Sequence, residues 1–104
     1  MKIYMDDVRE APDGWTRTYS AHETIALLEA NGRSVTHLSL DHDLGFCVAP
    51  GYNVVLYLRE RWENSGVEPP AVVLVHSANP VGRQSMEQAI ARLREVIADS
   101  KTKA

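Results

Sequence analysis

Residues 71–86, AVVLVHSANPVGRQSM, join an unbroken apolar run to the start of a helix, and this unit decides the fold of the chain. The apolar run at 71–75 is typical of a parallel strand covered on both faces, which predicts a central strand. Asn79 then predicts a helix N-cap, and Pro80 suits the first helical position. The helix itself is predicted by apolar residues at helical spacing: Met86, Ile90, Leu93 and Ile97.

The rest of the chain repeats this alternation of strands and helices. Further strands are predicted at residues 2–6, 15–19 and 35–40, and further helices from the Ser20–Glu23 capping box to Asn31-Gly32 and from Gly51 to Gly66. The resulting order is ββαβαβα. It predicts an α/β, three-layer fold with a mostly parallel sheet of about four strands and about three helices on both faces.

Length and composition limit the organisation and the partners. The 104 residues predict one domain at 1–99, followed by a flexible tail at 100–104. The net charge of -3 divides into -4 for residues 1–50 and +1 for residues 51–104, so binding to a long nucleic acid is not expected. No apolar run suits a membrane span, and the single cysteine, Cys47, cannot form an internal disulfide; the cytoplasm is the expected location.

Acidic and histidine side chains follow three of the predicted strands: Asp6, Asp7, Asp41, His42, Asp43 and His76. Because ligands of parallel sheets bind beyond the carboxyl ends of the strands, these residues predict a single site. Carboxylate oxygens suit a divalent cation, Mg²⁺ or Mn²⁺, and the expected ligands are Asp6, Asp7 and Asp41. The alternative is that these carboxylates are solvated residues of turns and caps.

The candidate catalytic residues are Asp41, His42, Asp43 and His76. An imidazole can carry a proton in either direction near neutral pH, so His42 and His76 could serve as general base and general acid on a phosphodiester. Either could instead bind a softer metal. His76 could also be a structural histidine that is hydrogen-bonded to the backbone.

A phosphate-binding site is predicted at the start of the third helix, from Ser77, Asn79, Gly82 and Arg83. Free N–H groups and the helix dipole favour an anion there, and Arg83 would share it. The alternative is ordinary capping by Asn79 with Arg83 in solvent. Arg9 could clamp a second phosphate or form a surface ion pair, and Tyr52 could offer an aromatic face to a base.

Three motifs resemble those of the cyclic-phosphate processing receiver family, whose fold is receiver-like (flavodoxin-like). They are Asp6-Asp7-Val8-Arg9-Glu10-Ala11-Pro12-Asp13-Gly14-Trp15, Leu40-Asp41-His42-Asp43-Leu44-Gly45 and His76-Ser77-Ala78-Asn79-Pro80-Val81-Gly82. A signalling receiver would have a helix in place of the loop at 9–14, and a fifth strand, a lysine and a fifth helix after Ile97. The resemblance therefore implies a fold that is truncated relative to a full receiver, in which phosphoaspartate switching is not expected.

The resemblance implies chemistry on, or capture of, a cyclic nucleotide or a 2′,3′-cyclic phosphate. The first hypothesis is a metal-assisted phosphodiesterase, a hydrolase that opens the cyclic phosphate. The second is a module that binds a cyclic nucleotide signal without turnover, and the third is a degenerate receiver used for protein contacts. A homodimer through a helix face left bare by the missing fifth unit is a further expectation.

Overall fold

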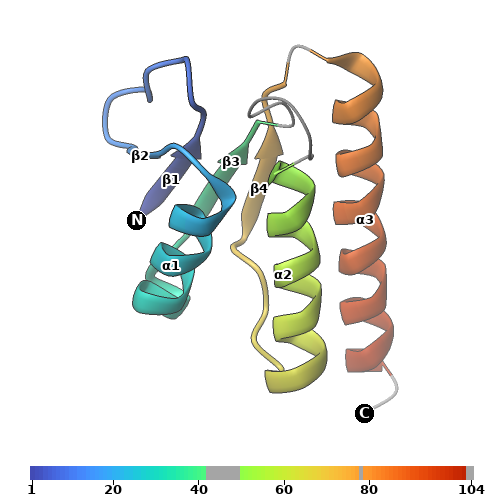
Figure 1. The fold of residues 1–104 in the computed structure, drawn as a ribbon. Coiled ribbons are helices and arrows are strands. Elements are labelled where there is room, and N and C mark those ends of the chain that lie inside the picture. Colours follow the sequence, from blue (N-terminus) through green and yellow to red (C-terminus); the bar gives the residue numbers. More distant parts are fainter. Residues whose placement is uncertain (42–49, 78, 103–104) are drawn as a thin grey trace.

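A computed structural model describes residues 1–41, 50–77 and 79–102 of the chain. Four parallel strands form one sheet, β1 (Lys2–Met5), β2 (Thr16–Thr18), β3 (His37–Leu40) and β4 (Val72–Val75), in the order β2-β1-β3-β4. The helices are α1 (Ala21–Asn31), α2 (Pro50–Ser65) and α3 (Pro80–Thr102), with a short 3-10 turn, η1, at Gly32–Ser34. Figure 1 shows this arrangement, and it confirms the α/β class and the predicted order of elements.

The predicted helix starts are confirmed by their capping bonds. The Ser20 side chain accepts the N–H of Glu23 at the start of α1. Asn79 Oδ1 accepts the N–H groups of Val81 and Gly82, with Pro80 at the first position of α3. Such side-chain acceptors satisfy donors that have no partner inside a helix.

All three helices in the described part of the chain pack on one side of the sheet, so the expectation of helices on both faces is wrong there. The crossovers from β2 to β3 and from β3 to β4 run in the same direction across the sheet, and right-handed crossovers then place α1 and α2 on the same face. Helix α2 contacts both α1 and α3, and α3 contacts β4 (Figure 1). The loop between β1 and β2 takes the place of a helix that would cover the other face.

Alternate strand residues therefore meet different surroundings. Ile3, Leu38 and Val73 are partners across β1, β3 and β4, and they face the helices in the core. Tyr4, Ser39 and Leu74 are partners on the opposite face, which we call the open face of the sheet. Trp15 packs edge-on against Tyr4 and His37 there, as ring centroids 6.2 and 5.9 Å apart indicate.

Strand β4 lies at the edge of the described sheet, next to β3, so the prediction of a central strand is wrong. Leu74 is 50% exposed, as expected where no helix covers the open face. The apolar run of residues 71–75 cannot distinguish an edge strand from a central one, because strand order depends on the crossovers. The centre of the sheet is shared by β1 and β3.

The C-terminal end of the described chain is helical. Helix α3 continues through residues 100–102, where Lys101 Nζ donates to Glu68 Oε1 at 2.7 Å and Thr102 Oγ1 donates to the Ala98 carbonyl. Residues 103–104 lie outside the described part. Among the described helices, none combines the length and the apolar character that crossing a membrane requires.

Candidate functional site

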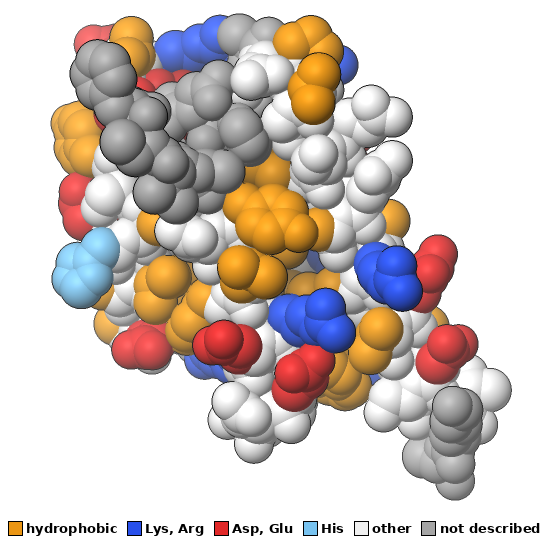
Figure 2. Space-filling model, turned by 45° about the vertical axis from the view of Figure 1, so that its right-hand side comes forward, with side chains coloured by type: hydrophobic (Ala, Val, Ile, Leu, Met, Phe, Trp, Pro, Cys, Tyr) orange, Lys and Arg blue, Asp and Glu red, His pale blue; other side chains and the backbone are white. Residues whose placement is uncertain are grey.

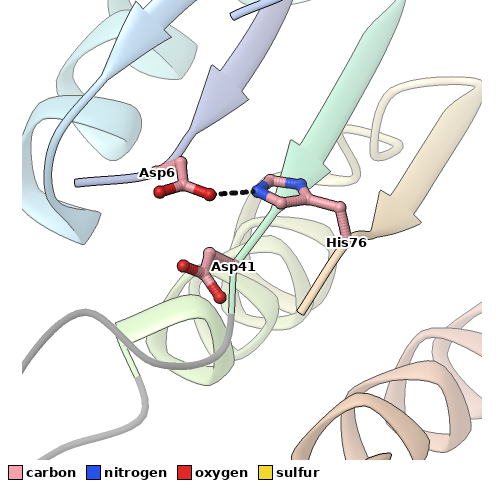
Figure 3. Close-up of side chains that lie close together, drawn as sticks. All are labelled: Asp6, Asp41 and His76. Atoms are coloured by element: carbon pink, nitrogen blue, oxygen red, sulfur yellow. Dashed lines mark hydrogen bonds and ion pairs between the residues drawn. The ribbon is translucent and has the colours of Figure 1, made fainter. Parts of the chain in front are cut away.

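The register of the sheet places Asp6, Asp41 and His76 side by side. Met5 pairs with Leu40 and Leu40 pairs with Val75, so the next residue of each strand reaches the same level at the carboxyl end of the sheet. Backbone bonds continue the ladder, since Asp41 N donates to Met5 O and His76 N donates to Leu40 O. One ligand atom from each of the three side chains lies within 4.8 Å of the others (Figure 3).

Asp6 is almost fully buried, with 2% of its surface exposed, yet its carboxylate is well supplied with donors. Oδ1 accepts the N–H groups of Val8 and Arg9, each at 2.8 Å, and Oδ2 lies 3.1 Å from His76 Nε2. Burial by itself raises the pKa of Asp6, but the hydrogen bonds from Arg9, Val8 and His76 outweigh it and lower the pKa below 3.8. Asp6 is therefore a carboxylate at neutral pH.

His76 is held on three sides. Its Nε2 meets Asp6, its Nδ1 lies 2.7 Å from Ser39 Oγ, and its ring stacks on Tyr4 with centroids 4.1 Å apart and planes 8° from parallel. Burial lowers the pKa of His76 below 6.5 and outweighs the nearby carboxylates of Asp6 and Asp41, which raise it. The ring is neutral at neutral pH, and the contact with Asp6 is a hydrogen bond to an uncharged imidazole.

These contacts assign the tautomer of His76. An ionised carboxylate can only accept a hydrogen bond, so Nε2 carries the ring proton that is donated to Asp6. Nδ1 is then unprotonated and accepts a hydrogen bond from the hydroxyl of Ser39. Sequence analysis missed both Ser39 and Tyr4, because each lies inside a predicted strand. The period of two along β1 and β3, which places both on the face opposite the core, was the available signal.

Two arginines fix the backbone around the cluster. Arg9 reaches across the sheet and donates from its guanidinium to the His76 carbonyl at 3.0 Å. Arg17 Nε donates to the Asp6 carbonyl at 3.1 Å, while Asp6 N donates to Thr18 O. Arg9 therefore lies at this crevice, with a backbone carbonyl as its partner and Asp7 exposed beside it. Its predicted role toward a phosphate stays a prediction.

Asp41 lies where β3 ends and close to the first turn of α2. Its side chain lies beside Asp6 and His76 (Figure 3), and one of its carboxylate oxygens lies within 4.8 Å of a ligand atom of each. Gly51 permits this approach, because a Cβ at that position would lie 2.3 Å from the Asp41 carbonyl oxygen. The start of α2 is therefore packed directly against the site.

The predicted phosphate-binding residues are locally bonded. Ser77 is buried, and its hydroxyl accepts the N–H of Asn79. Asn79 in turn caps α3, and Gly82 is buried in the first turn. Arg83 is exposed and forms an ion pair with Glu87 one turn further on, with Nε and Oε1 3.3 Å apart. This pair is the surface arrangement that the sequence left open as the alternative for Arg83.

The remaining predicted residues are not part of the described cluster. Tyr52 lines a groove between α2 and α3, on a face where hydrophobic side chains lie beside Lys or Arg and Asp or Glu side chains (Figure 2). His42 and Asp43 lie outside the described residues, as does Cys47. Their predicted roles remain predictions.

The donor atoms of the cluster fit a divalent cation. Two carboxylates and one imidazole offer oxygen and nitrogen ligands from three different strands, and such sets bind Mn²⁺ and related metals. Buried Asp6 keeps its negative charge without a cation because three donors already meet it. Among the described residues this group contains His76 and not Asp7, whose predicted role as a ligand stays a prediction.

The fold and the cluster together define a receiver-like protein with a carboxylate–imidazole site at the carboxyl end of its sheet. The family model of the cyclic-phosphate processing receiver domain matches residues 1–92, and the chain belongs to this family. This match confirms the resemblance found in the sequence. No curated protein and no solved structure matches the chain.

Proposed function

We propose that this protein is a phosphodiesterase that opens a cyclic phosphate, either in a cyclic nucleotide or at a 2′,3′-cyclic end. One observation carries the proposal: ligand atoms of Asp6, Asp41 and His76 lie within 4.8 Å of one another at the ends of three adjacent strands. Membership of a cyclic-phosphate processing family supports the class of substrate. The protein is a cytoplasmic enzyme in this proposal.

Asp6, Asp41 and His76 would hold the divalent cation, Mn²⁺ or Mg²⁺, with Asp7 as a further candidate ligand from the sequence. A bound cation of this kind polarises a phosphoryl oxygen and lowers the pKa of water. Asp6 contributes a buried charge whose position is fixed by the backbone of Val8 and Arg9. A rigid ligand of this sort favours a defined position for the phosphate.

The two histidines have different roles in this proposal. Both ring nitrogens of His76 are engaged, by Asp6 and Ser39, and only 15% of its side chain is exposed. This arrangement favours His76 as a ligand over His76 as a proton carrier. Proton transfer to the leaving oxygen is then assigned to His42, with Asp43 beside it in the sequence.

Arg9 is the favoured cation for the phosphate. One N–H of its guanidinium donates to the His76 carbonyl, which holds the group at the edge of the cluster. A guanidinium has five donors in a planar fork, so further N–H groups can bind phosphate oxygens. Arg83 is a second candidate, but it must leave Glu87 to bind a ligand. Ser77, Asn79 and Gly82 would supply the helix start near it.

The homodimer proposal is placed at the groove between α2 and α3, which is a helix face as the sequence led us to expect. The groove exposes Tyr52, Leu56 and Val96, at 36–44% each, and Arg59 and Arg92 line it. Arg59 Nε and Glu63 Oε1 form an ion pair within α2 at 2.9 Å, and Glu95 lies on α3 with Arg92; such mixed charges allow two copies to pair about a two-fold axis. A second copy is therefore the proposed occupant of the groove.

Light scattering after size exclusion tests the dimer. Leu56→Asp should convert a dimer into a monomer, whereas Val81→Asp, at an exposed position of α3 outside this groove, should leave it intact. A wild-type protein that is monomeric at high concentration would contradict the proposal.

The activity test incubates the protein with cyclic mononucleotides, cyclic dinucleotides and 2′,3′-cyclic ends, with Mn²⁺, Mg²⁺ or EDTA, and identifies products by mass spectrometry. A linear phosphate that is lost with EDTA supports the enzyme. Asp41→Asn should abolish it, and Asp99→Asn, the same change at an exposed position on α3, should not. An intact cyclic ligand released only by denaturation would instead support the non-catalytic binder, and neither result would favour the degenerate receiver.

A further inference from the structure

Ser39 carries a buried hydroxyl that contacts the cluster. It lies in β3 between Leu38 and Leu40, which face the core, so its side chain points to the open face. Only 4% of Ser39 is exposed, and its Oγ lies 2.7 Å from His76 Nδ1. A polar side chain on the uncovered face of a sheet is usually solvated; here the ring of His76 lies against it.

The linear arrangement of Ser39, His76 and Asp6 does not suit a nucleophile. A nucleophilic hydroxyl must reach the substrate, and Ser39 Oγ lies in a buried contact beneath the imidazole. At the other end of this series of hydrogen-bonded side chains, the carboxylate of Asp6 belongs to the proposed cation site. The hydroxyl therefore acts through His76.

The chemistry of a hydroxyl suits the two states that His76 needs. With Nε2–H donated to Asp6, Nδ1 has a lone pair and Ser39 donates to it. If Nε2 becomes a metal ligand, that nitrogen must lose its proton, and the neutral ring then carries its proton on Nδ1. The same Ser39 oxygen can accept a hydrogen bond from this Nδ1–H, because a hydroxyl both donates and accepts hydrogen bonds. The ring releases one proton from Nε2 and takes up one proton at Nδ1, so its charge is unchanged.

Tyr4 makes this exchange possible without movement of the ring. Tyr4 is the partner of Ser39 in the register of β1 and β3. Its ring stacks nearly parallel on the ring of His76, with the two centroids 4.1 Å apart. The stack fixes the plane of the imidazole, and the two hydrogen bonds fix its rotation within that plane. Only the position of the proton has to change.

We propose that Ser39 is a positioning residue that holds His76 with Nε2 directed at the cation site and supports both neutral tautomers of its ring. The part of this proposal that concerns a cation rests on the proposed function. The part that concerns the ring does not, since it depends only on the contacts of Ser39, Tyr4 and His76.

The test is the side-chain ¹⁵N spectrum of the histidines in the wild-type protein, S39A and S39T, without added metal. The wild type and S39T should place the His76 proton on Nε2, and S39A should give a mixture of tautomers. Thr24→Val is the matched control. It removes a buried hydroxyl that bonds Thr18 and the Ser20 carbonyl, so it reports the general effect of such a loss and should leave His76 unchanged.

Mn²⁺ affinity, measured by electron paramagnetic resonance of the free ion, is the second readout. Loss of an outer partner of a ligating histidine weakens metal binding by about 10–100-fold, so S39A should bind at least about tenfold more weakly than wild type and S39T should recover most of this loss. An S39A protein with the wild-type tautomer and the wild-type affinity would overturn the proposal. If the wild type binds no Mn²⁺ but S39A changes the tautomer, the ring assignment stands and the cation part fails, while the proposed function is decided separately by the product analysis.

Discussion

Replacement of Gly51 by alanine tests whether α2 is packed against the site as closely as the structure describes. The new Cβ would lie 2.3 Å from the Asp41 carbonyl oxygen and 2.6 Å from Cε of Met86, whereas ordinary contacts begin at 3.4 Å. The methionine can rotate, but the Asp41 backbone is fixed by its bond to Met5 O. The helix or the end of β3 must therefore shift by about 1.1 Å, the difference between 3.4 and 2.3 Å.

The expected effect on stability is the balance of two opposing contributions. Overpacking in a close-packed interior costs about 1–3 kcal/mol. Replacing glycine by alanine inside a helix is otherwise stabilising by about 0.5–1 kcal/mol. We therefore expect Gly51→Ala to lower the free energy of unfolding by about 1–2 kcal/mol, and to weaken Mn²⁺ binding because Asp41 moves.

Urea unfolding followed by circular dichroism measures the free energy, with backbone amide spectra to locate the shift. Asn53→Ala, an exposed position in the same turn, is the matched control and should stabilise the protein by about 0.5 kcal/mol. A Gly51→Ala protein as stable as wild type, with unshifted amide signals at residues 40–41, would refute the close packing of α2 against Asp41.

Three further predictions concern charge. Asp41→Asn should abolish turnover and leave the unfolding curve unchanged; persistent turnover would remove Asp41 from the mechanism. Arg83→Ala should change stability by less than about 1 kcal/mol, since its ion pair with Glu87 is exposed, but should weaken phosphate binding measured by calorimetry; equal affinity would leave Arg9 as the phosphate cation. The pKa values of Asp6 and His76 are both lowered in the folded protein, below their ordinary values of 3.8 and 6.5. Each shift therefore stabilises the folded state at a pH above the ordinary pKa, and this contribution is lost as the pH falls through the folded pKa. Urea midpoints that stay constant from pH 7 to pH 3 would contradict both shifts.

The sequence predicted local structure well where single residues govern it. Ser20 and Asn79 act as caps because their side chains bond N–H groups only two or three residues away. Gly66 follows the last turn of α2 with a φ of 66°, a conformation that favours glycine. Such signals depend on neighbours along the chain, so one sequence suffices to find them.

The candidate site was partly predictable for a related reason. Asp6, Asp41 and His76 each directly follow an apolar strand, and parallel strands bring their carboxyl ends to one edge of the sheet. The sequence could not tell which strand-end residues belong to the cluster. From their positions in the sequence, Asp7 and His76 were equally plausible members of the cluster. In the structure the turn after β1 leaves Asp7 exposed, whereas Asp6 accepts hydrogen bonds from the N–H groups of Val8 and Arg9.

Contacts between distant residues decided the rest. The order of strands, and hence the exposed position of Leu74, depends on the direction of each crossover, which an apolar run does not encode. The helices share one face because both crossovers run the same way. Ser39 and Tyr4 acquire their roles only when β4 brings His76 onto the open face, 37 and 72 residues away in the chain. The sequence by itself thus determined the elements and the residues at their ends, whereas the tertiary structure decided which of those residues meet, because that depends on strand order and register.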